Sequence, residues 1–490
     1  MATQNVKRKF TAIFSAATID RLKKTGLKYW KSTPTTIKTI ATIVIALNAG
    51  WQLYSRWTPS VEVTHKEKAV PSVSEIEVAS KEKMAFALPD VPSIAVLPFV
   101  NISEDPKQEF LSDGITENII TALSKVPRLF VISRQSTFSY KGKPVKVKQV
   151  SEELGVRYVL EGSVQRSADR IRINAQLIDA LTGHHLWAER YDRDLKDLFA
   201  LQDEITIKIL TAIRVKLTDG EQASMTEKSY EKYYKGKQGL NCYLKIMEGI
   251  GYVQRWNIED SNLGRRMIEE AIAICPENPV GYISLGWAYH HDYWLGNTKS
   301  PQETIEKSME LAQKALALDD SLGGVHALLC QLYITKGEYD KAIAEGERAV
   351  ALNPSGTDVL SEYAGSLNSA GRSEEAIPLF KKVIRLNPFG KFTLYRRLGL
   401  ALRRTGRLEE AVSAFKKAIQ GSPNDIMSHL GLAATYSIMG REEEARAEAA
   451  EVIRINPKFS LDSYSKRFPQ PMDQSRRDEY INALRKAGLK

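Results

Sequence analysis

Hydrophobic residues follow two different periods in the two halves of this 490-residue chain. Between residues 92 and 218, short apolar runs such as SIAVLPF and RLFVIS are typical of buried strands, and stretches with helical spacing lie between them. In RIRINAQLID, apolar residues such as Ile171 and Ile173 alternate with polar ones, which predicts a strand with one face on a core. A helix over VKQVSEELGV ended by Gly155, and a longer helix from about Asp194 to Leu217, complete a small α/β domain, which we place at 93–218.

The second half of the chain is built from an internal repeat. Prolines end successive units at intervals of 34, 35 and 34 residues, glycines mark a turn at the same intervals, and an alanine follows each turn, where helices cross closely. These positions are Pro354, Pro388, Pro423 and Pro457; Gly337, Gly371, Gly406 and Gly440; and Ala342, Ala376, Ala411 and Ala445. The period predicts an all-α superhelix over 240–458, with five clear or nearly clear helix pairs and one uncertain pair. A helix from Gln474 to Lys486, within a segment at 459–490, is expected to cap the end.

The first 57 residues combine positive charge with an apolar stretch. Nine basic residues precede the 17 residues from Thr39 to Ser55, which carry no formal charge, and Trp51, Tyr54 and Trp57 gather at the far end. This pattern predicts a transmembrane helix at 36–57, with the basic segment 1–35 in the cytoplasm and the bulk of the chain in the periplasm. A cleavable signal peptide and a buried soluble helix remain as alternatives. The proline-containing stretch 58–92 is expected to be a linker. We therefore expect a single-pass protein of the inner membrane.

The net charge of +10 does not indicate a nucleic-acid-binding protein. Residues 1–57 hold ten basic residues and one acidic residue, which gives +9 and leaves +1 for the rest of the chain. A DNA-binding domain would concentrate positive charge on a folded face. The three cysteines lack a C-x-x-C pair, so we expect neither a disulfide framework nor a zinc site. Asp105, Asp113 and Glu117 are interpreted as ordinary acidic residues near the start of a helix.

Several sequence blocks resemble known families. PSIAVLPFVNIS, LSDGITENIITALSKV, GVRYVLEGSV and INAQLIDALTGHHLWAERYD resemble the TolB amino-terminal-like module over roughly 92–218, and the 34-residue period resembles the tetratricopeptide repeat. In bacteria the TolB-like module often joins class III adenylate cyclases, or winged-helix regulators, to such repeats. The resemblance implies an α/β fold with an accessory or sensing role and no known reaction.

The string VKRKFTAIFSAATIDRL is similar to the opening strand of a class III cyclase catalytic domain. The resemblance implies a metal-binding aspartate at the position that Ala17 holds, and the following residues do not continue that domain. Cyclisation by two metal ions requires carboxylates to hold both ions. We therefore expect a relative that lost its catalytic domain, with no catalytic residues, no metal site, no cofactor and no cyclase activity.

The repeats are where we expect a protein or peptide partner to bind. Stacked repeats form a groove lined mainly by the first helix of each pair. In repeat register the groove positions are Gln331, Asn368, Arg396, Arg403 and Arg404. Arginines suit the binding of carboxylates, although a solvated basic helix face is the alternative. Trp287, His290 and Tyr293 are assigned to core packing. The leading hypothesis is a membrane-anchored, non-enzymatic adaptor, and the alternative is an accessory or sensory subunit of a cyclase-type signalling system; the oligomeric state is left open.

Overall fold

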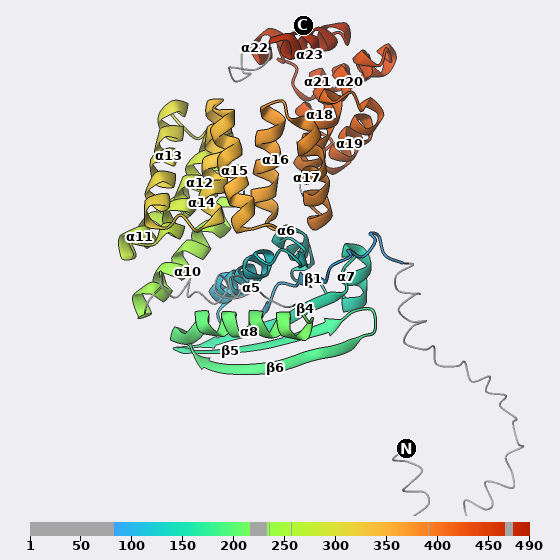
Figure 1. Cartoon of the computed structure of the whole chain (residues 1–490). Coiled ribbons are helices and arrows are strands. Elements are labelled where there is room, and N and C mark those ends of the chain that lie inside the picture. Colours follow the sequence, from blue (N-terminus) through green and yellow to red (C-terminus); the bar gives the residue numbers. More distant parts are fainter. Residues whose placement is uncertain (1–82, 216–232, 235, 256, 391, 466–473) are drawn as a thin grey trace, which may run out of the picture. The chain divides into compact units, whose positions relative to one another are not determined.

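The computed structural model describes residues 83–215, 233–234, 236–255, 257–390, 392–465 and 474–490. The predicted basic segment, membrane helix and most of the linker lie outside these ranges. In the described ranges, no helix has both the length and the apolar character needed to cross a membrane. Residues from 71 onward belong to one compact unit, which holds both the α/β domain and the helical repeats (Figure 1).

The α/β domain is built on a mixed sheet with the order β3-β1-β4-β5-β6. β1 lies parallel to β3 and β4, β2 also pairs with β4 in parallel, and β4, β5 and β6 are antiparallel. The strands are β1 (Ser93–Val96), β2 (Val100–Asn101), β3 (Phe130–Val131), β4 (Tyr158–Ser167), β5 (Arg170–Asp179) and β6 (His184–Asp194). The predicted strands are confirmed, although RLFVIS yields only two strand residues and the short β2 was not predicted.

Helices cover the two faces of this sheet. The domain's helices are α5 (Glu109–Ser124), α6 (Arg134–Thr137), α7 (Val147–Leu154) and α8 (Leu198–Ala212), with 3-10 turns η3 (Pro106–Gln108), η4 (Phe138–Tyr140) and η5 (Leu195–Asp197). α5 and α8 share a core with one sheet face, and α7 packs on the other face near β1 (Figure 1). The alternation in β5 is confirmed because Ile171 and Ile173 are buried in the first core. The helix predicted over 194–217 is shorter because residue 194 still belongs to β6.

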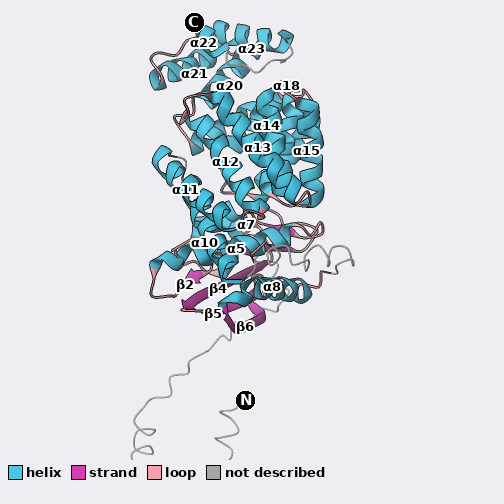
Figure 2. Ribbon diagram, turned by 90° about the vertical axis from the view of Figure 1, so that its left-hand side faces the viewer, coloured by secondary structure: helices cyan, strands magenta, loops and turns pink. Residues whose placement is uncertain are grey.

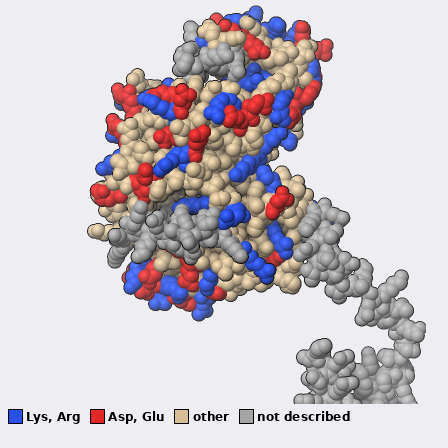
Figure 3. Space-filling model, viewed as in Figure 1, with Lys and Arg blue, Asp and Glu red and all other residues tan. Residues whose placement is uncertain are grey.

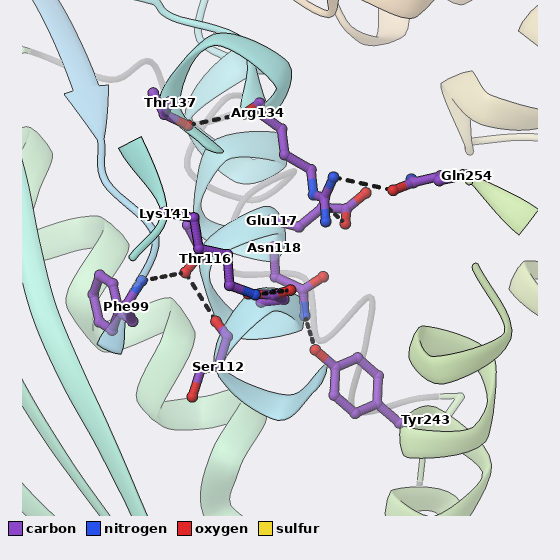
Figure 4. Close-up of polar contacts among 11 residues, drawn as sticks. Phe99, Ser112, Thr116, Glu117, Asn118, Arg134, Thr137, Lys141, Tyr243 and Gln254 are labelled. Atoms are coloured by element: carbon purple, nitrogen blue, oxygen red, sulfur yellow. Dashed lines mark hydrogen bonds and ion pairs between the residues drawn. The ribbon is translucent and has the colours of Figure 1, made fainter. Parts of the chain in front are cut away.

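Local signals explain where the elements end. α7 stops at Gly155, which adopts φ +62°, a conformation that glycine takes without steric cost. Ala168 and Gly183 occupy the two hairpin turns with positive φ. Thr116 on α5 accepts a hydrogen bond from the Phe99 amide at 3.0 Å and fixes the loop after β1 to the helix (Figure 4).

The helical half contains six helix pairs within the described residues (Figure 2). They are α10 (Gly236–Val253) and α11 (Ile258–Ile274), α12 (Pro279–Leu295) and α13 (Pro301–Leu318), α14 (Gly323–Lys336) and α15 (Tyr339–Leu352), α16 (Thr357–Ser369) and α17 (Ser373–Leu386), α18 (Thr393–Arg404) and α19 (Leu408–Gly421), and α20 (Ile426–Ile438) and α21 (Glu442–Ile455). The four repeat glycines all have positive φ, and the four repeat alanines are buried, as predicted. The uncertain first pair is therefore a complete helix pair.

The first helix pair is packed against the α/β domain. Tyr243 of α10 is fully buried, and its hydroxyl accepts a hydrogen bond from Asn118 of α5 at 3.0 Å (Figure 4). Its ring also packs edge-on against Phe199 of α8. One hydrophobic core thus runs from the sheet through α5 and α8 into α10 and α11. The α/β domain and the first repeat therefore share one hydrophobic core.

Later repeats also contact the α/β domain through polar groups. Arg385 at the end of α17 donates hydrogen bonds to the backbone carbonyls of Leu154 and Gly155, at 2.9 and 2.7 Å. The amide of Ser133 donates to the carbonyl of Leu386 at 2.9 Å. These contacts join residues more than 200 positions apart, so local sequence patterns do not predict them.

Candidate functional site

The first helices of the pairs form a continuous surface, which we call the first-helix face; it is built from α12, α14, α16, α18 and α20. Neighbouring first helices contact one another along this face. At its α12 end, Trp294 is 61% exposed and donates an indole hydrogen bond to His290 at 3.1 Å. His290 lies beside Gln331 of α14. Burial lowers the pKa of His290 to about 3, with smaller effects from His291 and from Arg397 on α18. Its imidazole therefore stays neutral and supports the exposed indole.

Two of the five predicted groove residues are buried. Gln331 is 7% exposed and Asn368 is 8% exposed. The Asn368 side-chain oxygen accepts a hydrogen bond from Ser373 at 2.8 Å and thereby ties α16 to the start of α17. The structure does not place these two residues on an exposed groove, because repeat register fixes the helix face but not how closely the neighbouring pair covers it.

The three predicted arginines are engaged inside the chain. Arg396 forms an ion pair with Asp425 at 2.8 Å, and Arg404 donates a hydrogen bond to the backbone carbonyl of Asn368. The Arg403 guanidinium lies 4.3 Å from the centre of the Tyr480 ring, in a cation–π contact. Each of these arginines therefore has a partner within the chain, and their role in binding a separate protein stays a prediction.

The C-terminal segment covers the end of the first-helix face that α18 and α20 form. It contains α22 (Leu461–Ser465) and α23 (Gln474–Lys486), and α23 has the bounds predicted from the sequence. α23 packs against α20, and its residues Tyr480, Ile481 and Leu484 join the core of the last repeats. The predicted cap is confirmed as a helix at the end of the repeats, and its Tyr480 ring contacts Arg403.

A cavity of about 990 Å³ lies where the α/β domain meets the repeats. Its walls come from α5 and α6 on one side, and from the beginnings of α12, α14, α16 and α18 on the other. Glu117 of α5 pairs with Arg134 at 3.0 Å, and Arg134 also donates a hydrogen bond to Gln254 of α10 at 3.0 Å (Figure 4). Glu117, interpreted from the sequence as an ordinary acidic residue of a helix, is therefore part of the polar wall of this cavity.

Glu117 and Asp358 line this cavity and keep contact with solvent, because the Glu117 side chain is 32% exposed and Asp358 is exposed. Loss of hydration raises the pKa of Glu117 although Arg134 opposes the shift, and Asp358 and Asp113 raise it further. Asp358, near the start of α16, has solvent-accessible surface, yet desolvation raises its pKa as well. Asp358 lines the cavity, and its carboxyl remains accessible to solvent there. The sequence contains no signal that Glu117 and Asp358 line the same cavity, because they lie on elements more than 200 residues apart.

Two buried histidines recur at equivalent positions of α14 and α20. His326 faces the Glu345 carboxylate at 2.6 Å and the Asp320 carbonyl at 2.8 Å, while His429 faces Glu448 at 2.6 Å and the Pro423 carbonyl at 3.0 Å. All four partners are acceptors, so both ring nitrogens donate only when the ring is charged. Burial opposes the charge on His326, but its hydrogen bonds outweigh that effect and raise its pKa; the bond to Glu448 raises that of His429.

Charges of both signs are interspersed over the face shown in Figure 3. Among the described residues, no group of three or more His, Cys, Asp and Glu side chains is arranged to hold a metal ion. The described part therefore has two candidate sites, the first-helix face and the cavity between the α/β domain and the repeats.

Comparison with known families supports the division of the chain. Residues 329–391 and 402–463 match tetratricopeptide-repeat families, so the helix pairs in these ranges are tetratricopeptide repeats. Residues 90–208 match the family described as HilA/YgeH-like transcriptional regulator, second domain. That match coincides closely with the predicted α/β domain but carries a different family description, so the TolB-like resemblance stays a prediction.

One relative connects the chain with cyclases. It is named "Putative adenylate cyclase 3", from Rhizobium meliloti (strain 1021), and is 48% identical over 237 residues. The match covers 48% of this chain and 39% of the relative, so the chain spans about two-fifths of that protein. A link to adenylate cyclases is therefore supported by sequence.

Solved structures resemble parts of this chain. YrrB, described as a tetratricopeptide-repeat protein with an unusual peptide-binding site, is 22% identical, with a TM-score of 0.31 over 41% of this chain and 98% of that one. PilF of Pseudomonas aeruginosa is 17% identical, with a TM-score of 0.37 over 46% of this chain and 96% of that one.

Proposed function

We propose that this protein is a non-enzymatic adaptor that binds a protein or peptide partner on its first-helix face, chiefly at the α12 end. The observation that carries the proposal is the exposed indole of Trp294, held by a buried, neutral histidine. Tryptophan is enriched among the residues that dominate interface energies. Arg396 and Arg403, the predicted partner contacts, are occupied by Asp425 and Tyr480, which moves the proposed site away from α18.

The experiment is a crosslinking capture with the full chain in membranes. Trp294→Ala should weaken capture of the specific partner by about thirtyfold, as expected for a dominant interface residue. Ile453→Ala is the control, because Ile453 is an exposed apolar residue on the second helix α21. Equal capture by wild type and Trp294→Ala, or an equal loss with Ile453→Ala, would reject the α12 end as the binding surface.

Membrane anchoring is part of the proposal. The nine basic residues before the uncharged stretch from Thr39 to Ser55 support a cytoplasmic N-terminus and a periplasmic bulk. Alkaline phosphatase fused after Lys490 should be active, and a fluorescent protein that folds only in the cytoplasm should stay dark there. The reverse pattern would reject this topology.

A second candidate function is an accessory or sensory subunit of a cyclase-type signalling system. The 48% identity to the rhizobial relative favours it. In either case we propose that the chain itself has no cyclase activity, since Ala17 stands at the metal-ligand position that the resemblance implies. Purified protein with ATP or GTP and Mg²⁺ or Mn²⁺ should form no cyclic nucleotide. Formation of cyclic nucleotide would reject the non-enzymatic assignment.

A further inference from the structure

The two helices of the first pair each carry a cysteine at the contact between them. Cys242 lies on α10, and Cys275 is the residue that ends α11. The Cys242 thiol donates a hydrogen bond to the Ala271 carbonyl at 3.4 Å, and the Cys275 amide donates to the same carbonyl at 2.9 Å. In return, the Cys275 thiol donates to the carbonyl of Gln238, one helical turn before Cys242, at 4.0 Å. The two cysteines therefore lie opposite each other across the helix pair.

The backbones of α10 and α11 come close enough together for a covalent link. Gly249 and Gly264 face each other along the same contact. A Cβ atom added at Gly249 would lie 2.9 Å from the Gly264 carbonyl oxygen, and one added at Gly264 would lie 2.6 Å from the Gly249 carbonyl oxygen. Both distances are too short for a real Cβ atom, so the two helices touch through their backbones. The Cα atoms of a disulfide are about 4.4–6.8 Å apart, which requires such a close approach.

Both sulfur atoms belong to the core that the α/β domain and the first repeat share. Cys242 is fully buried in this core, and Cys275 is partly exposed and packs against it. Burial, and then the Cys275 thiol, raise the pKa of Cys242 above its usual range, which agrees with neighbouring sulfur atoms. The remaining cysteine, Cys330, is buried on α14 and is not part of this core.

We infer that Cys242 and Cys275 form a disulfide that holds α10 to α11 under oxidising conditions. The periplasm, where the proposed topology places this part of the chain, is an oxidising environment. The capacity of the two thiols to link follows from their placement, so it rests neither on that topology nor on partner binding at Trp294. The sequence did not predict the pair, because helix packing brings together two cysteines that share no C-x-x-C motif.

The reaction is thiol–disulfide exchange with a small disulfide such as oxidised glutathione. Because Cys275 is the partly exposed thiol, its thiolate attacks one sulfur of the oxidant, forms a mixed disulfide and releases one glutathione thiolate. The Cys242 sulfur then loses its proton and attacks the Cys275 sulfur, which releases the second glutathione. Two protein thiols are thereby oxidised to one disulfide, and the oxidant is reduced to two thiols.

The test is incubation of the folded full chain with oxidised glutathione, followed by maleimide labelling of the remaining thiols in denaturant. Wild type should keep one reactive thiol, that of Cys330, instead of the three of the reduced chain. A peptide map without reductant should show the Cys242 peptide linked to the Cys275 peptide. Hydrogen exchange in α10 and α11 should become slower by about thirtyfold or more in the oxidised form, because a disulfide limits opening of the segment that it closes.

Cys330→Ser is the matched control, because Cys330 is a buried cysteine of another repeat. It should keep the link and leave no reactive thiol after oxidation. Cys275→Ser should keep two reactive thiols and should not show the slower exchange. Serine is a small change at this partly exposed helix end, and circular dichroism should show the helix content of wild type.

Three reactive thiols in wild type after oxidation would overturn the inference, as would glutathione that stays on Cys275 or a link that involves Cys330 or a second chain. Equal exchange in the oxidised and reduced forms would overturn it too, because the link would then not hold α10 to α11. An inactive phosphatase fusion, by contrast, would reject the topology alone.

Discussion

The two ends of the repeat array are closed in different ways. At the N-terminal end, the α/β domain covers α10 and α11 through a shared core centred on Tyr243, with the Asn118 hydrogen bond inside it. At the C-terminal end, the single helix α23 covers α20 and part of α18. Helical repeats bury their surfaces only against neighbours, so each end needs a cover. A whole domain covers one end and a short helix the other.

The two ends of the repeat array should therefore unfold in different ways. A cover that belongs to a folded domain couples the first repeat to the sheet, whereas a terminal helix can detach with only the last repeat. We expect disruption at the first end to spread into the α/β domain, and disruption at the second end to stay local.

The largest effect is expected from Tyr243→Ala. It removes a fully buried aromatic side chain and leaves a cavity between α5, α8 and α10, which costs about 4 kcal/mol. Hydrogen exchange followed by mass spectrometry should show lost protection in both α5 and α10. Protection lost in α10 alone would show that the α/β domain and the first repeat open independently. The two ends of the repeat array would then not differ in how far disruption spreads.

A smaller and more local effect is expected from Leu484→Ala. Leu484 is fully buried on α23, and its truncation should cost about 3 kcal/mol. Because repeats contact mainly their neighbours, protection should fall in α20 to α23 and remain unchanged in the α/β domain. Loss of protection that reaches β4 or α5 would show that the C-terminal cover is coupled to the whole chain.

A third prediction concerns the pH dependence of the two repeats that contain His326 and His429. The pKa values of His326 and His429 are raised above the unfolded value of about 6.5, so their contribution to stability is complete below pH 6.5 and is lost as pH rises through the folded pKa. Each unit of pKa difference corresponds to about 1.4 kcal/mol. Opening of α14–α15 and of α20–α21 should become easier from pH 6.5 to 8.5.

The control for this prediction is the double variant His326→Gln/His429→Gln, whose opening should change less over the same window. His290 does not interfere, because its pKa of about 3 keeps it neutral throughout. An unchanged pH dependence in the double variant would show that these rings are not charged in the folded protein.

The smallest effect is expected from Arg446→Ala. Arg446 lies on α21 and pairs with Glu442 one helical turn away, on an exposed surface. Such substitutions shift stability by within about 0.5 kcal/mol. Thermal melting should therefore barely change. A clear drop in melting temperature would show that the C-terminal end depends on surface charge more than on the α23 core.

The sequence by itself determined the local architecture. The period of about 34 residues located the turns at Gly337, Gly371, Gly406 and Gly440, and alternation in RIRINAQLID assigned the buried face of β5. These two predictions are confirmed because helix turns and strand faces depend on nearby residues. Glycine accepts a positive φ, and apolar residues recur with the period of the element.

Tertiary structure alone decided which surfaces are exposed and which groups meet. The register identified Gln331, Asn368, Arg396, Arg403 and Arg404 as candidates, but burial, the Asp425 ion pair and the Tyr480 ring occupy most of them. Glu117 and Asp358 face one cavity although 241 positions separate them in the chain. Such long-range placement depends on how the α/β domain and α23 pack against the repeats, and a periodic pattern records only the spacing within each element.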